Sequence, residues 1–285
     1  MKKDSLSYFG NKGVTKIYPH TPGIDVAGIV EASENPTFSP GQKVIVTGFD
    51  LGVNTSGGYA EYIRVPSAWA IKCPKNLTSK ESMMIGTAGL TAGLCIAKIE
   101  EQMELSSLKV IVSGATGGVG SIAVKLLYKM GAQVTGITGK KDGEKFLKNL
   151  GCFEVISRKQ FIETTRLPLN KGIYDAAIDV AGGNILSCII ASIKYNGITT
   201  ICGNVAGPQF ETTVFPFILR ANQLFGIDSA TCSIKRREQI WNNFSSIWKL
   251  NDLEKMSKII SIQDLSVEIK KILNGNQTGR IVIKI

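Results

Sequence analysis

The feature that most restricts the fold of this chain is a glycine cluster in the stretch VSGATGGVGS, residues 112–121. Gly114, Gly117 and Gly120 recur at every third position, and Gly118 adds a fourth glycine. An apolar run precedes the cluster and an amphipathic run follows it, which predicts a strand, a tight turn and the start of a helix. Backbone N–H groups at a helix start lack partners and favour an anion. The stretch therefore predicts a pyrophosphate site, where side chains would hold the ligand away from the amides.

Short β-rich runs alternate with helix-length segments from residue 109 onward. The predicted strands cover 109–115, 133–139, 154–158, 174–182, 197–204 and 224–230. The clearest predicted helix directly follows the glycines, with its apolar residues on one face and Gly131 at its end, as is typical of a helix C-terminus. Six strands separated by helices indicate a doubly wound parallel α/β sheet, a Rossmann fold.

The first eighty residues have a different pattern, because short strand-like runs are punctuated by Gly and Pro and no helix is convincing. These runs lie at 23–33, 41–50 and 57–66. Thr78 and Glu81 have the spacing of a capping box, which predicts that a long buried helix begins there. The chain ends in a further strand-like run, 279–285, which we expect to return to the β domain.

Two domains follow from these patterns. We expect a mostly β domain formed by residues 1–81 and 231–285, and a nucleotide-binding α/β domain formed by residues 82–230. A chain of 285 residues is long enough for both.

Composition restricts the class of protein. With 44% hydrophobic and 20% charged residues, the chain is typical of a soluble globular protein. Its longest uncharged apolar run, 83–97, is short for a membrane span and rich in small residues, so it predicts a buried helix. The N-terminal lysines are not followed by the apolar stretch of a secretory signal. We therefore expect a cytoplasmic protein with no membrane partner.

The six cysteines are scattered, with no C-x-x-C pair, which favours reduced and mostly buried thiols. His20 is the single histidine and lies in the loop-like stretch YPHTPG, so no metal site is expected. The formal net charge is +10, but the basic residues are spread along the chain. A solvated basic surface is the first explanation, attraction of a polyanionic cofactor or substrate the second, and nucleic-acid binding the third.

An acidic residue is missing where NAD-binding proteins carry one. About twenty residues beyond the glycines, an Asp or Glu holds the ribose 2′-hydroxyl of NAD. Here that position falls on Thr138, Gly139, Lys140 and Lys141. A hydroxyl, a bare backbone and two ammonium groups suit a 2′-phosphate, which favours NADP as the cofactor. The alternative is that both lysines are merely solvated and Asp142 takes the ribose.

The chain resembles the zinc-independent branch of the medium-chain dehydrogenase/reductase superfamily, described as acryloyl-CoA reductases or quinone oxidoreductases. The resemblance runs from Lys3 almost to Ile285 and implies a GroES-like β domain beside the Rossmann domain. The stretches that carry it are 22–30, 57–66, 84–96, 112–131, 215–229 and 279–280. Zinc-dependent relatives have metal ligands in a Gly-His-Glu sequence, where this chain has Gly23-Ile24-Asp25.

The resemblance implies a set of cofactor contacts that extends the glycine turn. Together with Gly114 and Gly120 of the turn, the candidate cofactor-binding residues are Thr116, Gly117, Gly118, Val119, Thr138, Gly139, Lys140, Arg158, Asn204, Ile218 and Ser229. Arg158 would add a third cation near the expected 2′-phosphate. No metal ligand is implied.

Two departures from the family stand out. Met1-Lys2 occupies the place of an Asn-Tyr pair whose Tyr lies near the nicotinamide, and the family's opening strands have no counterpart here. A β domain without them would expose an edge and part of its core. We therefore expect lower stability and activity than in the full family form.

The implied reaction is hydride transfer from NADPH to the β-carbon of an α,β-unsaturated acyl-CoA such as acryloyl-CoA, then protonation of the α-carbon. The resemblance identifies no catalytic residue here. NADPH-dependent reduction of quinones or enones is the runner-up, and a truncated, inactive nucleotide- or RNA-binding protein is a third possibility. A small-molecule substrate is expected, and a homodimer is common in the superfamily.

Overall fold

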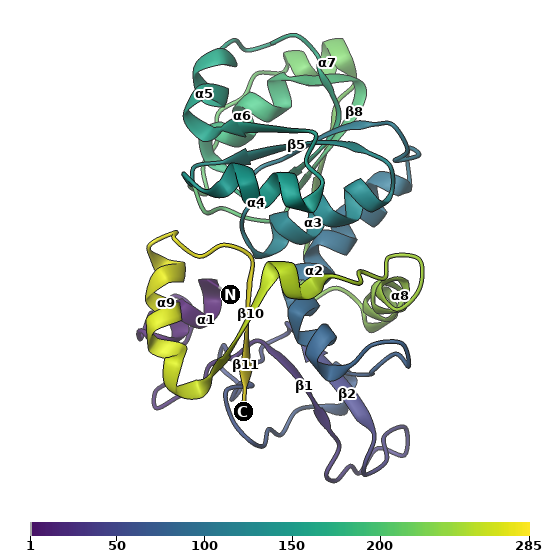
Figure 1. The fold of residues 1–285 in the computed structure, drawn as a ribbon, viewed down its shortest axis with the longest axis vertical. Helices are drawn as coiled ribbons and strands as arrows, with labels where there is room; N and C mark the ends of the chain where they lie inside the picture. Colours follow the sequence, from purple (N-terminus) through teal and green to yellow (C-terminus); the bar gives the residue numbers. More distant parts are fainter. Residues whose placement is uncertain (1) are drawn as a thin grey trace. The chain divides into compact units, whose positions relative to one another are not determined.

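The computed structural model describes residues 2–285, which form two compact units (Figure 1). The first unit combines the residues up to Leu90 with Ser229–Ile285, and the second unit is Thr91–Asp228. The sequence places the domain boundaries after residues 81 and 230.

The second unit is built on the six-stranded sheet that the sequence predicts. Its strands are β4 (Lys109–Val112), β5 (Gln133–Thr138), β6 (Glu154–Ser157), β7 (Tyr174–Asp179), β8 (Ile193–Ile201) and β9 (Gln223–Gly226). They are all parallel and lie in the order β6-β5-β4-β7-β8-β9. The strand order reverses between β4 and β7, so the doubly wound fold is confirmed, and the carboxyl ends of these two strands flank the switch point where such sheets bind ligands.

Helices cover both faces of this sheet (Figure 1). They are α3 (Gly118–Lys129), α4 (Gly143–Leu150), α5 (Arg158–Thr164), α6 (Gly183–Ala191) and α7 (Phe215–Arg220). The predicted helix after the glycines is α3, and the chain leaves it through Gly131 at φ +83°, a left-handed conformation that favours glycine.

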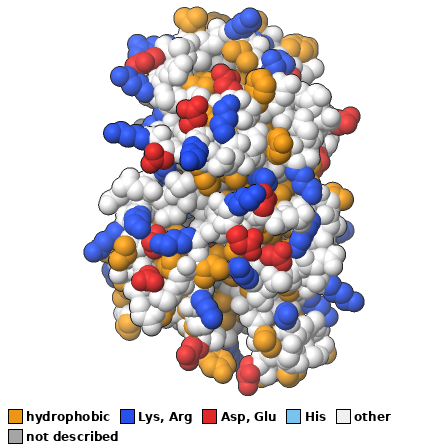
Figure 2. All heavy atoms as spheres, viewed as in Figure 1, with side chains coloured by type: hydrophobic (Ala, Val, Ile, Leu, Met, Phe, Trp, Pro, Cys, Tyr) orange, Lys and Arg blue, Asp and Glu red, His pale blue; other side chains and the backbone are white. Residues whose placement is uncertain are grey.

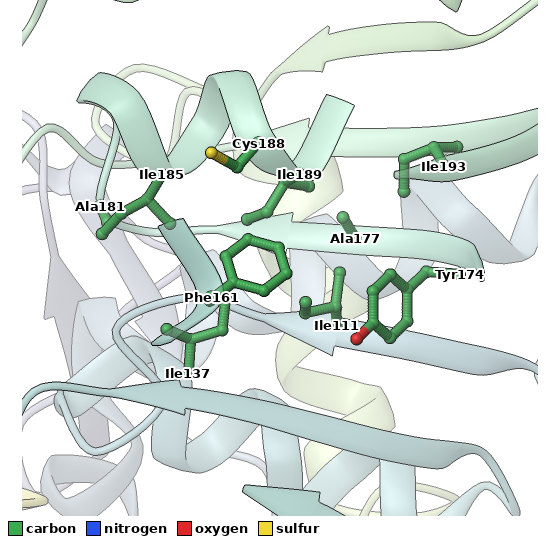
Figure 3. Close-up of a cluster of buried hydrophobic side chains, with 10 residues drawn as sticks. All are labelled: Ile111, Ile137, Phe161, Tyr174, Ala177, Ala181, Ile185, Cys188, Ile189 and Ile193. Atoms are coloured by element: carbon green, nitrogen blue, oxygen red, sulfur yellow. The ribbon is translucent and has the colours of Figure 1, made fainter. Parts of the chain in front are cut away.

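A buried apolar cluster joins one face of the sheet to α5 and α6 (Figure 3). Ile111, Ile137 and Ala177 come from β4, β5 and β7, while Phe161 comes from α5 and Ile189 from α6. Strands covered on both faces read as continuous apolar runs, which is why the sequence shows them clearly.

The first unit contains two small sheets. An antiparallel sheet has the order β1 (Asp25–Ile29), β2 (Lys43–Thr47) and β3 (Ala70–Lys72), and a parallel pair joins β10 (Ser257–Ser261) to β11 (Arg280–Lys284). Its helices are α1 (Lys2–Tyr8), α8 (Ile234–Phe244), α9 (Leu265–Leu273) and the 3-10 turns η1 (Ser67–Trp69), η2 (Leu253–Met256) and η3 (Ile262–Asp264).

Two expectations for this unit were wrong. A short helix, α1, begins the described chain, although no helix was expected in the first eighty residues. The run 57–66 is not a strand: Gly57 and Gly58 donate to the backbone carbonyls of Thr21 and Gly23, but among residues 2–285 no backbone hydrogen bond joins residues 60–65 to a neighbouring strand. The run has strand-like alternation, yet a strand exists only where a partner lies beside it.

The long helix α2 (Ser79–Glu100) begins as predicted, because the Thr78 hydroxyl accepts from Glu81 N at 3.1 Å and the Glu81 carboxylate accepts from Thr78 N at 2.8 Å. It is long and apolar enough to span a membrane by length and composition, but most of it is buried inside the protein. It also bends at Gly86, which has φ +52°. These features indicate a core helix.

The bend in α2 is stabilised by two charged side chains, the partly buried Asp25 and the buried Arg280. The Asp25 carboxylate accepts from the Thr87 amide at 2.7 Å, and the Arg280 guanidinium donates to the carbonyls of Met83 and Met84. Arg280 and Asp25 also lie 3.6 Å apart. Burial raises the pKa of Asp25, while the nearby Arg280 opposes the shift. The carboxylate caps the helix start after the bend and the guanidinium caps the helix end before it, as the helix dipole favours.

A second buried arginine, Arg237 of α8, connects distant segments of the first unit. Its guanidinium donates to the carbonyl oxygens of Thr47 at 2.7 Å, Ser229 at 2.8 Å and Ala230 at 2.6 Å. It also lies 4.1 Å from the centre of the Phe49 ring. The side chain therefore ties β2 to the segment that follows the sheet of the second unit.

Candidate nucleotide-binding site

The glycine turn connects the end of β4 to the start of α3. Gly114 has φ +55°, and Gly117 N donates to its carbonyl oxygen at 2.9 Å, which closes the turn. A Cβ on Gly120 would overlap the Gly114 carbonyl oxygen and lie 2.6 Å from the Cα of Ala115. Glycine at this position lets the helix pack directly against the turn.

Helix α3 begins without a side-chain cap. Gly117 occupies the N-cap position and has no side chain to accept from the first turn, whereas α5 and α8 are capped by Ser157 and Ser233. The amides at the start of α3 therefore have no side-chain acceptor, as is also the case for α4, α6, α7 and α9. A diphosphate would supply the acceptor, and the helix dipole favours its charge.

The end of β5 lies beside this turn. The hydroxyls of Thr116 and Thr138 are 3.3 Å apart, and Thr138 also accepts from Lys140 N at 3.2 Å. The guanidinium of Arg158 packs on Gly139, because a Cβ on Gly139 would lie 2.8 Å from Arg158 Nη2. The fold thus brings together the glycine turn, Thr138, Gly139, Lys140 and Arg158 as the sequence suggests.

The two cations at this edge have different surroundings. Arg158 is exposed at the start of α5, while Lys140 is half-buried. Burial lowers the pKa of Lys140, because an ammonium loses hydration there. A phosphate beside Lys140 would favour the charged form. The alternative ribose ligand, Asp142, is exposed at the N-cap position of α4 and its side chain makes no capping hydrogen bond there.

The remaining predicted contacts are more dispersed. Asn204 is exposed after β8, and its Cα would lie 3.3 Å from a Cβ on Gly182, so it neighbours the loop after β7. Ile218 is 68% exposed on α7. Ser229 belongs to the first unit, where its carbonyl accepts from Arg237.

Sequence reasoning missed two buried residues at the switch point. Ser113 directly follows β4. Its hydroxyl donates to the carboxylate of Asp179, the last residue of β7, at 2.6 Å. Both side chains are fully buried. The signal was a polar residue at the carboxyl end of an apolar run in both KVIVS and YDAAID, where parallel strands end side by side.

The sequence also carries expectations about metal sites and thiols. Within residues 2–285, no three His, Cys, Asp or Glu side chains gather as a metal site would require. Asp25, which takes the place of the family's metal-binding sequence, caps the bend in α2 instead. The cysteines are free thiols, three of them buried, and burial raises the pKa of Cys152 to about 12.

Surface charge is mixed on the face that Figure 2 shows, where Lys and Arg side chains alternate with Asp and Glu. On this face, the mixed charge suits a solvated surface better than a nucleic-acid groove. Of the pair that replaces the family's Asn-Tyr, Met1 lies outside the described residues and Lys2 is exposed at the start of α1.

Comparison with known proteins agrees with this geometry. A family model for the zinc-binding dehydrogenase matches residues 118–246, and one for the alcohol dehydrogenase GroES-like domain matches residues 3–75. The chain is 39% identical over 286 residues to YhfP of Bacillus subtilis strain 168, which is named as a quinone oxidoreductase. It is 34% identical over 284 residues to acrylyl-CoA reductase AcuI of Ruegeria pomeroyi. Both alignments cover 99% of this chain and 86% of the relative.

Solved structures show the same fold over the whole chain. The yhdH oxidoreductase of Salmonella enterica in complex with NADP has a TM-score of 0.95 at 37% identity, covering 100% of this chain and 88% of that one. Bacillus subtilis yhfP with NAD bound has a TM-score of 0.95 at 38% identity, covering 100% and 87%. The chain therefore belongs to the medium-chain dehydrogenase/reductase family, and combines a Rossmann-like unit with a GroES-like one.

Proposed function

We propose that this protein is an NADPH-dependent reductase that transfers hydride to the β-carbon of an α,β-unsaturated acyl-CoA such as acryloyl-CoA. The observation that carries the proposal is the uncapped start of α3 beside the cationic end of β5. The relatives support it, because one solved homologue holds NADP and a curated homologue is named for acrylyl-CoA reduction.

The residues present fit this nucleotide. The diphosphate would lie against the amides of Gly118, Val119 and Gly120 at the start of α3, where the N-cap residue Gly117 presents no side chain that could take its place. Lys140 and Arg158 would hold the 2′-phosphate, and the Thr138 hydroxyl would donate to the adjacent ribose. NADPH, when bound, supplies the hydride.

The protein's own part is to bind and orient. The rigid turn fixes one end of the nucleotide, and orientation of this kind removes much of the entropic barrier to reaction. The thioester oxygen gains charge as hydride arrives, so hydrogen-bond donors aimed at that oxygen would lower the barrier. We assign no side chain as the proton donor, and the α-carbon takes its proton from solvent in this proposal.

Nucleotide preference is the first test. Fluorescence titration with NADPH and NADH should show tighter binding of NADPH. Lys140→Ala should weaken NADPH binding about tenfold, or about 1.4 kcal/mol, and leave NADH binding within twofold. Lys171→Ala, which removes an exposed lysine elsewhere in the second unit, is the matched control. Equal affinities for both nucleotides in the wild type would reject the assignment of Lys140 and Arg158.

The substrate is the second test, because YhfP is named as a quinone oxidoreductase. NADPH oxidation should be followed with acryloyl-CoA and with 1,4-benzoquinone at equal concentrations. Faster turnover of acryloyl-CoA supports the proposal, and faster turnover of the quinone favours the runner-up. Binding of NADPH without turnover of either compound would point to the inactive nucleotide-binding alternative.

The setting of the enzyme is also part of the proposal. We infer a cytoplasmic enzyme that acts on small molecules, and a homodimer as its assembly. Sedimentation of the purified protein tests the last point, since a monomer at micromolar concentration would refute it.

A further inference from the structure

The end of β7 carries a buried polar pair that the sheet itself does not need. The Ser113 hydroxyl donates to one carboxylate oxygen of Asp179 at 2.6 Å, and both side chains have no exposed surface. Neither takes part in the ladder between β4 and β7, which is made by backbone groups. Burying a carboxylate costs free energy, and the loss of hydration here raises the pKa of Asp179.

The pair holds three consecutive backbone amides. The Ser113 hydroxyl oxygen accepts from Val180 N at 2.9 Å and from Ala181 N at 3.1 Å. The second carboxylate oxygen of Asp179 accepts from Gly182 N at 2.7 Å. An ionised carboxylate accepts at both oxygens, whereas an amide or a protonated acid would present a donor to one partner. The loop 180–182 is therefore fixed by two side chains.

This loop lies between two parts of the nucleotide site. On one side, a Cβ on Gly114 would lie 3.5 Å from the Cβ of Val180, so Val180 packs on the glycine turn. On the other side, Ala181 O accepts from Ala206 N at 2.7 Å, and a Cβ on Gly182 would lie 3.3 Å from the Cα of Asn204. The loop thus connects the turn to the segment that carries Asn204.

Asp179 reaches that segment directly as well. The Asp179 carbonyl oxygen accepts from Cys202 N at 2.9 Å, just after β8. Three loops at the carboxyl ends of β4, β7 and β8 are consequently connected through one serine and one aspartate. The switch point between β4 and β7 is where ligands bind in such sheets.

We propose that Ser113 and Asp179 are positioning residues of the nucleotide site, which hold the loops after β4, β7 and β8 in the arrangement that accepts NADPH. They touch no cofactor themselves. Because the loops are fixed before binding, the protein loses less conformational freedom when the nucleotide arrives. The inference rests on the proposed function, since it assumes that this edge of the sheet binds NADPH.

The test compares two buried serines in the second unit. Ser113→Ala removes the connecting hydroxyl, while Ser192→Ala removes a fully buried hydroxyl that donates to Cys188 O at the amino end of β8. Affinity for NADPH is measured by fluorescence titration. We expect Ser113→Ala to weaken NADPH binding at least tenfold and Ser192→Ala to change the affinity less than twofold. This difference should hold even where the two variants have similar melting temperatures.

Steady-state kinetics and hydrogen exchange separate positioning from a general structural effect. In Ser113→Ala, KM for NADPH should rise at least tenfold while kcat changes less than threefold. In the nucleotide-free protein, the amides of Val180, Ala181 and Gly182 should exchange at least tenfold faster in Ser113→Ala than in Ser192→Ala. If Ser113→Ala does not fold, Ser113→Cys keeps the size of the side chain with a weaker acceptor, and should give a smaller change in the same direction.

The outcomes distinguish the two proposals. A wild-type protein that binds no NADPH overturns both the proposed function and this inference. Wild-type binding, with folded Ser113→Ala or Ser113→Cys matching the affinity and amide exchange of Ser192→Ala within twofold, overturns this inference alone.

Discussion

Gly120→Ala gives the most direct test of how the glycine turn works. The added Cβ would overlap the carbonyl oxygen of Gly114 and lie 2.6 Å from the Cα of Ala115. Both are backbone atoms and cannot rotate away. Carbon atoms pack about 3.5–4.0 Å apart, so the start of α3 must move by about 1 Å from the turn.

The size of the effect follows from that movement. A shift of about 1 Å stretches an amide hydrogen bond from about 2.9 Å to beyond its useful range. Each charge-assisted bond to the diphosphate that is lost costs about 1.5–3 kcal/mol, so NADPH should bind roughly 10- to 150-fold more weakly. The overlap should cost about 1–3 kcal/mol of stability, against which alanine returns up to about 1 kcal/mol of helix propensity.

Gly226→Ala is the matched control. This glycine lies in β9 of the same unit, and no heavy atom lies within 4 Å of a Cβ placed there. Fluorescence titration should show wild-type affinity for NADPH in Gly226→Ala and the loss in Gly120→Ala. A folded Gly120→Ala protein that binds NADPH within twofold of the wild type would refute the role given to the turn.

Three further predictions concern the first unit. Hydrogen bonds from Lys258 and Lys271 hold the pKa of the Glu268 carboxyl below its ordinary value. Glu268 therefore stabilises the fold above about pH 4.3, and this contribution is lost as pH falls through the folded-state pKa. Urea unfolding of Glu268→Gln should show a loss of about 1 kcal/mol at pH 7 that shrinks in acid. Arg237→Met removes the donor of three hydrogen bonds to the carbonyl oxygens of Thr47, Ser229 and Ala230 and should cost about 3 kcal/mol. A loss below about 1 kcal/mol in urea unfolding would contradict the role given to Arg237. Gly86→Ala should lower the melting temperature more than Gly275→Ala, because both have positive φ but only the first Cβ would meet charged side chains.

The sequence was sufficient for the sheet of the second unit because its signals are local. Each strand is an apolar run covered on both faces, and the glycine turn marks where the first strand passes into a helix. The capping box of Thr78 and Glu81 spans three residues and could be read directly. Patterns among residues close together in the sequence predict such elements well.

The rest depends on contacts between distant residues. Asp25 and Thr87, which meet at the bend of α2, are 62 residues apart, and Ser113 and Asp179 are 66 residues apart. The run 57–66 has the alternation of a strand but no partner strand within residues 2–285. Local patterning cannot report whether a partner is present, so these features emerged only from the three-dimensional arrangement.

The way the first unit is divided along the chain sets an order for its synthesis. Its buried ties join early residues to late ones: Arg237 donates to Thr47 O, and Arg280 donates to the carbonyls of Met83 and Met84. Thr91–Asp228, the uninterrupted unit, is synthesised before either arginine. We expect the sheet to fold first, while the residues up to Leu90 remain exposed to chaperones and proteases until the segment with Arg237 and Arg280 has been synthesised.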